Sequence, residues 1–268
     1  MGQRVKAILT IGGSDSGGSA GIQADLRTIH CLGEWGTCAI TCITAQNPEQ
    51  ITKIEPVSPE TVYQQIKLVC EKFEIDAVKI GMLYSAEIVE IVITALRKWK
   101  IPYIVLDPII KATSGARLVQ HDAWKLICHK LLPLVTIVTP NVYEAETLAG
   151  FSINSIEDMK KSAFHIWKKY GVACVVKGGH LKDGRDEKFS RKLKQKSTHF
   201  AVDVLCTDGK IHIFPGARLN FRKGFHGTGC VFSSALAVFL SRCCGEIVEA
   251  VRLTKQYMQC FLKEKSIG

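Results

Sequence analysis

Short apolar runs alternate with amphipathic segments along nearly the whole chain, and this alternation limits the possible folds more than any other feature. Runs typical of buried β-strands cover residues 6–11, 36–43, 76–80, 102–106, 135–138 and 172–176. Helical patterns follow them at 22–30, 59–73, 87–99, 122–132, 144–148 and 157–170. Strands that are apolar on both faces and are separated by helices indicate a mostly parallel sheet covered on both sides. We therefore expect an α/β fold, a three-layer α/β/α sandwich.

The pattern changes in the last quarter of the chain. Two short strand patterns, at 200–206 and 211–215, flank an Asp-Gly turn and predict an antiparallel hairpin near the C-terminal end. Two closing helices are expected at 230–241 and 246–263. The chain contains no repeat and no low-complexity linker. The sequence thus predicts a single domain over residues 1–268.

Composition excludes several classes of protein. No apolar run reaches the ~18–20 residues that a membrane span needs, so no membrane contact is expected. The 11 cysteines form no Cys-x-x-Cys pair and mostly lie in apolar runs, which favours reduced thiols and a cytoplasmic location. Much of the excess behind the net charge of +10 is local, since residues 182–196 contain seven Lys/Arg and three acids. This segment is either a solvated loop or a flap near a polyphosphate. No motif supports a nucleic-acid partner.

A glycine-rich loop follows the first strand. Five of the ten residues 12–21 are glycine, which permits a close approach of the backbone to a ligand. The loop is not a Walker A motif, because no Gly-Lys-Ser/Thr follows it. It also lacks the acidic residue that would complete a dinucleotide fingerprint. By itself, the loop indicates a nucleotide site only weakly.

A second glycine-rich stretch, residues 224–230, begins a helical pattern with Gly227, Thr228, Gly229 and Cys230. The free N–H groups and the positive dipole end of such a helix start form an anion site. A thiol in the first helical turn tends to have a lowered pKa, so Cys230 is a candidate nucleophile or base. The alternative is a glycine loop before a buried helix with a buried cysteine.

Polar residues gather where the predicted strands end: Asp15, Gln46, Asp107, Asn141, Glu144 and Lys177. The carboxyl edge of an open parallel sheet is where ligands bind. The amide of Gln46 both donates and accepts, which suits the edge of a neutral heteroaromatic ring. A lysine, carboxylates and an anion site are the components that phosphoryl transfer needs.

These segments together resemble the ribokinase superfamily and, within it, the hydroxymethylpyrimidine/phosphomethylpyrimidine kinases of thiamine synthesis. The sharpest matches are Gly-Ile-Gln-Ala-Asp at 21–25 and Gly-Thr-Gly-Cys at 227–230, because most of the superfamily has Asp at the position of Cys230. Further matches, in the family's order, lie at 10–15, 45–47, 79–83, 106–108, 114–115, 139–141, 144–145 and 177–180. The chain departs from the family at Val231, where Thr is usual, and at Lys111, where an apolar residue is usual.

The resemblance implies an ATP-dependent kinase that phosphorylates the alcohol of 4-amino-5-hydroxymethyl-2-methylpyrimidine and then the resulting monophosphate. It places Cys230 as catalytic base, the backbone of 227–230 around the transferring phosphoryl group, and Lys177 on the ATP phosphates. The implied pyrimidine pocket consists of Gln46, Gly13, Ala20, Thr44, Met82 and Ile109, with Asp25 near the hydroxymethyl end. The implied ATP site adds Asp107, Thr207, Asp208 and Gly209.

The resemblance also implies that Asn141 and Glu144 hold Mg²⁺ through water, and it makes a homodimer possible. Two other functions remain open at this point. One is a pyridoxal-type kinase of the same superfamily, which a larger pocket would favour. The other is a non-catalytic ligand-binding module that kept the fold.

Overall fold

A computed structural model of the chain describes residues 4–112, 114–179, 200–217 and 227–267. Within these residues one nine-stranded sheet runs in the order β3-β2-β1-β4-β5-β6-β7-β8-β9. Its strands are β1 (Ala7–Asp15), β2 (Trp35–Gln46), β3 (Ile51–Pro56), β4 (Ala77–Ile80), β5 (Tyr103–Leu106), β6 (Ile137–Val138), β7 (Ala173–Lys177), β8 (Phe200–Thr207) and β9 (Lys210–Ala217). The basic segment 182–197 lies outside the described residues.

The central strands β2, β1, β4, β5, β6 and β7 pair in parallel, as the sequence predicts. β8 pairs antiparallel with β7, and β9 antiparallel with β8, which confirms the predicted hairpin. A second antiparallel pair, β2 with β3, was not expected. It forms because β2 continues to Gln46 and the chain turns back at Asn47, whose side chain accepts hydrogen bonds from the N–H groups of Glu49 and Gln50.

Helices cover both faces of the sheet and form the three expected layers. The described helices are α1 (Gly21–Cys31), α2 (Pro59–Lys72), α3 (Ala86–Trp99), α4 (His121–Leu126), α5 (Val142–Ala149), α6 (Ile156–Tyr170), α8 (Thr228–Arg242) and α9 (Ile247–Ile267). The predicted helix 122–132 is α4 continued by a π-helical turn (Ile127–Leu131), after which comes a 3₁₀ turn (Leu132–Leu134).

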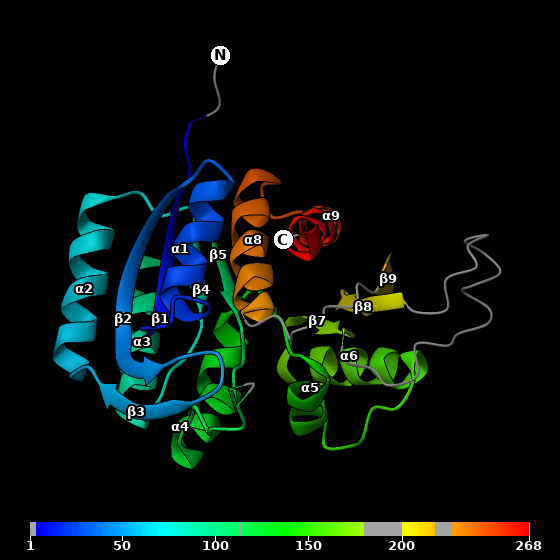
Figure 1. Cartoon of the computed structure of the whole chain (residues 1–268), viewed down its shortest axis with the longest axis horizontal. Coiled ribbons are helices and arrows are strands. Elements are labelled where there is room, and N and C mark those ends of the chain that lie inside the picture. Colours follow the sequence, from blue (N-terminus) through cyan, green and yellow to red (C-terminus); the bar gives the residue numbers. More distant parts are fainter. Residues whose placement is uncertain (1–3, 113, 180–199, 218–226, 268) are drawn as a thin grey trace.

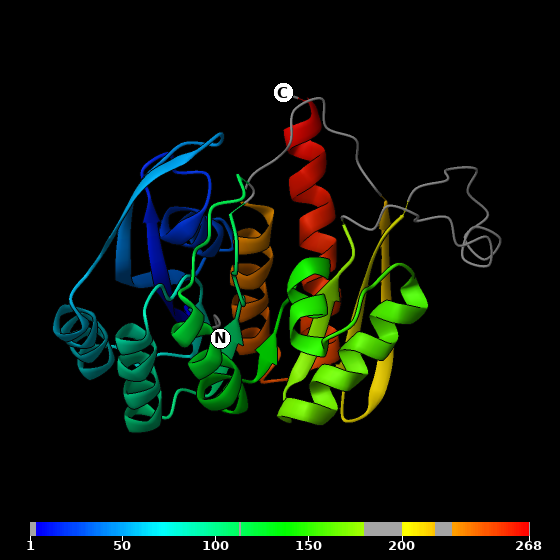
Figure 2. The same ribbon diagram turned by 90° about the horizontal axis from the view of Figure 1, so that it is seen from below.

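Alternate residues of the strands supply two apolar cores. Leu9 and Ile11 of β1 pack with α2, α3, α4, α5 and α6 on one face. Ile8 points to the other face, where it packs with α1, α8 and α9. Figures 1 and 2 both show α8 lying between α1 and α9 on that face. Because α8 lies beside α1, the two glycine-rich stretches of the sequence meet.

Two further sequence predictions concern the environment of the protein. All 11 cysteines are free thiols, as predicted for a reduced protein. None of the helices in the described part of the chain is long and apolar enough to cross a bilayer.

Candidate active site

A cavity of about 700 Å³ opens at the carboxyl edge of the parallel strands. It is lined by most of the residues that the sequence singled out, which come from positions 13 to 230 of the chain. These are Gly13, Ala20, Asp25, Thr44, Gln46, Met82, Asp107, Ile109, Asn141, Glu144, Lys177, Gly227, Thr228, Gly229 and Cys230. The predicted substrate, phosphate and metal residues therefore face one space.

Three predicted ATP-site residues, Thr207, Asp208 and Gly209, do not line the cavity. The reason is the direction of β8, which leaves the cavity edge at Asp203, opposite Lys177, and runs back toward the other edge of the sheet. The turn at its end packs against α6, where a Cβ on Gly209 would lie 3.2 Å from the ring of Trp167. The assignment of these three residues to the ATP site therefore stays a prediction, and Asp203 of the same strand lines the cavity.

The start of α8 packs against the glycine loop that follows β1. Gly227 precedes the helix with φ of 83°, a left-handed conformation that glycine adopts without strain. A Cβ at this position would lie 1.9 Å from the carbonyl oxygen of Ser19, so a larger residue cannot occupy it without displacing the loop. No side chain caps α8, which leaves its first N–H groups available to an anion in the cavity.

Lys177 and Asp107 form an ion pair beside this helix start. Lys177 Nζ lies 3.0 Å from Asp107 Oδ1, and Thr139 Oγ1 lies 3.3 Å from the same oxygen. Burial lowers the pKa of Lys177, but Asp107 and Glu144 more than offset it, so the pKa stands above its ordinary value. A Cβ on Gly229 would lie 3.5 Å from both Lys177 Nζ and Asp107 Oδ2. The ion pair therefore borders the anion site directly.

The thiol of Cys230 does not have the lowered pKa that its place in a helix suggested. Burial raises the pKa of Cys230 to about 11, although the charge of Lys79 and the N–H of Gly21 act in the opposite direction. Only 7% of the residue is exposed, and Asp25 and Asp107 add negative charge nearby. Cys230 is thus a protonated thiol at neutral pH in the ligand-free protein.

Asn141 and Glu144, the predicted metal pair, form a capping box at the start of α5. Asn141 Oδ1 accepts from the Glu144 N–H at 2.9 Å, and Glu144 Oε2 accepts from the Asn141 N–H at 2.8 Å. Burial raises the pKa of Glu144 to about 7; Lys177 lowers it and Asp107 raises it. In the described part of the chain no three acidic, His or Cys side chains cluster as a metal cage. The two carboxylates of Glu144 and Asp107 suit Mg²⁺, which is usually shared with substrate phosphates and water.

The opposite end of the cavity is lined by small and apolar groups. Cys42 Sγ and Met82 Sδ lie 3.5 Å apart behind Gly13, where a Cβ would come within 2.8 Å of the cysteine sulfur. Thr44 Oγ1 lies 2.9 Å from the carbonyl oxygen of Ser14 and 3.2 Å from Gln46 Oε1. These contacts hold the Gln46 amide beside the small and apolar residues that line this end of the cavity.

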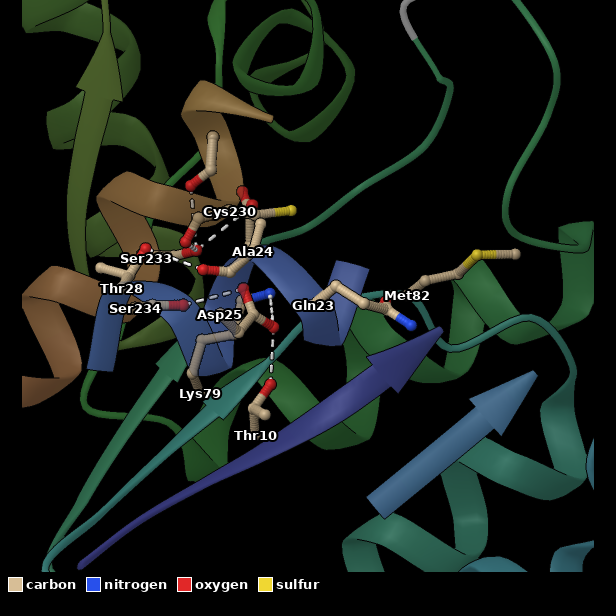
Figure 3. Close-up of polar contacts among 12 residues, drawn as sticks. Thr10, Gln23, Ala24, Asp25, Thr28, Lys79, Met82, Cys230, Ser233 and Ser234 are labelled. Atoms are coloured by element: carbon tan, nitrogen blue, oxygen red, sulfur yellow. Dashed lines mark hydrogen bonds and ion pairs between the residues drawn. The ribbon is translucent and has the colours of Figure 1, made fainter. Parts of the chain in front are cut away.

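Asp25 lies deeper than the sequence suggested. Its side chain is fully buried, and its carboxylate accepts hydrogen bonds from Thr10, Lys79 and Ser234, at 2.6, 2.8 and 2.8 Å (Figure 3). Each carboxylate oxygen of Asp25 already accepts a hydrogen bond from the protein. These bonds compete with the predicted contact between Asp25 and the hydroxymethyl group.

Sequence reasoning gave no role to several residues that shape the site. Lys79 was identifiable, since a lysine inside the apolar strand 76–80 must have a partner. Ser233 and Ser234 follow Cys230 in α8, and Asp203 pairs with Lys255 at 2.7 Å at the far end of the cavity. The residues that these side chains contact lie far away in the sequence, so no local sequence pattern could predict the contacts.

A parallel sheet with an uncapped helix start, a lysine and two carboxylates at its carboxyl edge defines a small-molecule kinase of the ribokinase-like type. The family model described as phosphomethylpyrimidine kinase matches residues 15–267, and the chain belongs to this family.

Curated relatives agree with this assignment. A hydroxymethylpyrimidine/phosphomethylpyrimidine kinase of Haemophilus influenzae is 39% identical over 95% of this chain and 90% of its own length. A bifunctional thiamine biosynthesis protein of Geobacter sulfurreducens is 36% identical over 96% of this chain. The match covers 49% of the length of that protein.

Solved structures share the fold over nearly the whole chain. A phosphomethylpyrimidine kinase of Clostridium difficile superposes with a TM-score of 0.78 at 34% identity, covering 96% of this chain and 99% of that one. A pyridoxal kinase of Staphylococcus aureus in complex with AMP-PCP and pyridoxal gives a TM-score of 0.80 at 28% identity, covering 96% and 87%.

Proposed function

We propose that this chain is a single-domain, ATP- and Mg²⁺-dependent kinase that phosphorylates 4-amino-5-hydroxymethyl-2-methylpyrimidine and then its monophosphate. The strongest support is that one cavity contains both parts of such a site. Gln46 and the small apolar residues line one end, and Lys177 and the start of α8 line the other. Membership in the phosphomethylpyrimidine kinase family supports the same substrate class.

The nucleotide would occupy the end of the cavity that lies beyond Lys177. That end is lined by Gly179, Ala201, Asp203, Ala217, Met258 and Gln259. Lys177 and the N–H groups of the first turn of α8 would hold the phosphates. Asn141 and Glu144 would hold Mg²⁺ through water, and the ion would supply further neutralisation of phosphate charge.

In the transfer step, the substrate hydroxyl attacks the terminal phosphorus, the bond to the ADP oxygen breaks, and the hydroxyl proton leaves. Cys230 lies where it could accept that proton as a thiolate. Its raised pKa keeps the thiolate fraction small at neutral pH. We therefore assign most of the rate to positioning and charge neutralisation by Lys177 and the α8 start, which phosphoryl transfer permits.

The test is an assay of ADP release with four acceptors: the hydroxymethylpyrimidine, its monophosphate, pyridoxal and ribose. Turnover with the first two supports the proposal. Preference for pyridoxal would indicate the alternative kinase, whose solved members share 28–29% identity, lower than the curated pyrimidine kinases at 34–39%. Binding of the pyrimidine with no ADP release would indicate the non-catalytic module.

The cytoplasmic location and the homodimer are also part of the proposal. Free cysteines throughout the chain support a reducing compartment. Exposed aromatic side chains at Trp35 and Phe73, whose ring centroids lie 6.5 Å apart, support a protein contact on that side of the molecule. Sedimentation of the purified protein would establish whether it is a dimer.

A further inference from the structure

Two neighbouring serines of α8 reach two different pairs of lysine and aspartate. Ser233 Oγ lies 3.4 Å from Asp107 Oδ2, and Asp107 pairs with Lys177. Ser234 Oγ donates to Asp25 Oδ1 at 2.8 Å, and Asp25 pairs with Lys79. The helix that begins with the anion site is therefore attached to the sheet by two parallel chains of serine, carboxylate and ammonium.

The two pairs differ in their access to the cavity. The side chain of Lys177 is 15% exposed, whereas those of Lys79 and Asp25 are 1% and 0% exposed. Thr10 also donates a hydrogen bond to Asp25, so this carboxylate has donors from β1, β4 and α8. The outer pair is open to a ligand. The inner pair, Asp25 and Lys79, also borders the cavity, but its side chains are almost completely covered.

The inner pair is close to Cys230. Ser234 lies four residues after Cys230, so both side chains project from the same face of α8. Figure 3 shows Cys230 above Asp25, Ser234 beside Asp25, and Lys79 below. The charged groups that act on Cys230 are Lys79 from β4, Lys177 from β7, Asp25 from α1 and Asp107 after β5. A Cβ on Gly81 would lie 2.8 Å from Lys79 Nζ, so a glycine leaves room for the ammonium group.

We propose that Ser234, Asp25 and Lys79 form a positioning relay that holds the part of α8 carrying Cys230 in place and keeps the Lys79 ammonium group close to the thiol, and that Asp25 does not bind substrate. The effect of the relay on catalytic rate rests on the proposed kinase function. Its effect on the reactivity of the Cys230 thiol can be measured without any enzymatic turnover. Neither Lys79 nor Ser234 touches the reacting atoms, so both are positioning residues.

The first experiment compares Ser234→Ala with Thr10→Val. Each variant removes one hydroxyl donor from the same buried carboxylate, but only the first removes a hydrogen bond that joins α8 to it. We expect Ser234→Ala to lower kcat about five- to tenfold with the KM for the pyrimidine within about twofold. Thr10→Val should change kcat by less than about twofold, with a similar loss of thermal stability. Equal kinetic effects of the two variants, or a rise in KM larger than the fall in kcat, would overturn the relay.

The second experiment measures the thiol directly. The wild type, Ser234→Ala and the charge-free double variant Lys79→Met/Asp25→Asn are alkylated with iodoacetamide at pH values from 7 to 11, and labelling at Cys230 is resolved by mass spectrometry. Exposed Cys260 is the internal reference. We expect the pH midpoint for Cys230 to rise by a fraction of a unit in the double variant, because Lys79 favours the thiolate more than Asp25 disfavours it. An unchanged midpoint in both variants would overturn the proposal even if the wild type phosphorylates no pyrimidine.

Discussion

Lys177 Nζ lies 3.0 Å from Asp107 Oδ1 in the cavity, so its ammonium group is paired with a carboxylate. This ion pair keeps a largely buried lysine charged without leaving it unpaired. Under the proposed function, a nucleotide phosphate must compete with Asp107 for this lysine, and the proposed magnesium ion would lie beside Asp107 and Glu144.

Replacing Lys177 by Met should lower kcat about a hundredfold and raise the KM for ATP, because the phosphates lose their main cation and Asp107 loses its partner. Lys161→Met is the control, since that side chain is 73% exposed on α6 and pairs only with Asp158, at 3.8 Å. Steady-state ADP release would measure both parameters. A Lys177→Met enzyme with kcat within twofold of the wild type would contradict the proposed role.

Cys230→Ala should severely reduce turnover while the pyrimidine still binds, as calorimetry would show. Since burial raises the pKa of Cys230 to about 11, the thiolate fraction grows with pH from 7 upward. A thiolate base therefore predicts that wild-type kcat rises over pH 7–9.5 and that the variant's residual rate does not. Cys260→Ala, on the exposed face of α9, should behave as the wild type. Near-normal turnover of Cys230→Ala would exclude the base role.

Glu144 should make Mg²⁺ dependence sensitive to pH. Burial raises its pKa to about 7, above the ordinary value of 4.5, so the neutral acid prevails below pH 7 and the metal-binding carboxylate above it. The Mg²⁺ concentration for half-maximal rate should rise about tenfold per pH unit below 7. The same group makes folding stability fall as pH rises from 4.5 to 7, because the folded state retains this proton.

Glu144→Gln should weaken the response to Mg²⁺ and make it independent of pH. The control is Glu157→Gln, because that side chain is 70% exposed and pairs with Lys160 outside the cavity. A pH dependence that persists in Glu144→Gln would show that another group titrates.

Adjacent glycines offer a test of the pyrimidine pocket. A Cβ at Gly13 would come within 2.8 Å of Cys42 Sγ and 3.2 Å of Met82 Sδ, whereas a Cβ at Gly12 meets no atom closer than 3.6 Å. Gly13→Ala should therefore raise the KM for the pyrimidine by about tenfold, and Gly12→Ala should leave it within about twofold. Parallel titrations of both variants would check this. Equal KM values would place the substrate elsewhere in the cavity.

Much of the fold could be predicted because the central strands and most helices carry strong apolar periodicity. β3 was missed because Ile51–Pro56 is a half-exposed edge strand in which two polar residues separate the isoleucines, so the alternation that marks a strand is absent. The π-helical turn after α4 changes the hydrogen-bond register without changing the composition of the segment. Neither feature leaves a distinct mark on the sequence.

For the site, the residues at the ends of parallel strands could be predicted to lie together, and they do. The position of Thr207–Gly209 depends on the direction of β8, which no local pattern determines. The pKa of Cys230 likewise depends on burial beneath α1 and β4, and the carboxylate of Asp25 on donors from residues 10, 79 and 234. Such properties arise only when distant segments have packed.

The contact between Gly227 and the carbonyl of Ser19 joins residues 208 positions apart, taking 227 − 19. The anion site can therefore not assemble during synthesis until residue 227 has left the ribosome. Until then β1 and its glycine loop lack the helix that covers them. Long-range closure of this kind slows folding and leaves apolar surface exposed meanwhile. A nascent chain of this protein should accordingly bind ligand, and resist proteolysis near the loop, only after α8 has emerged.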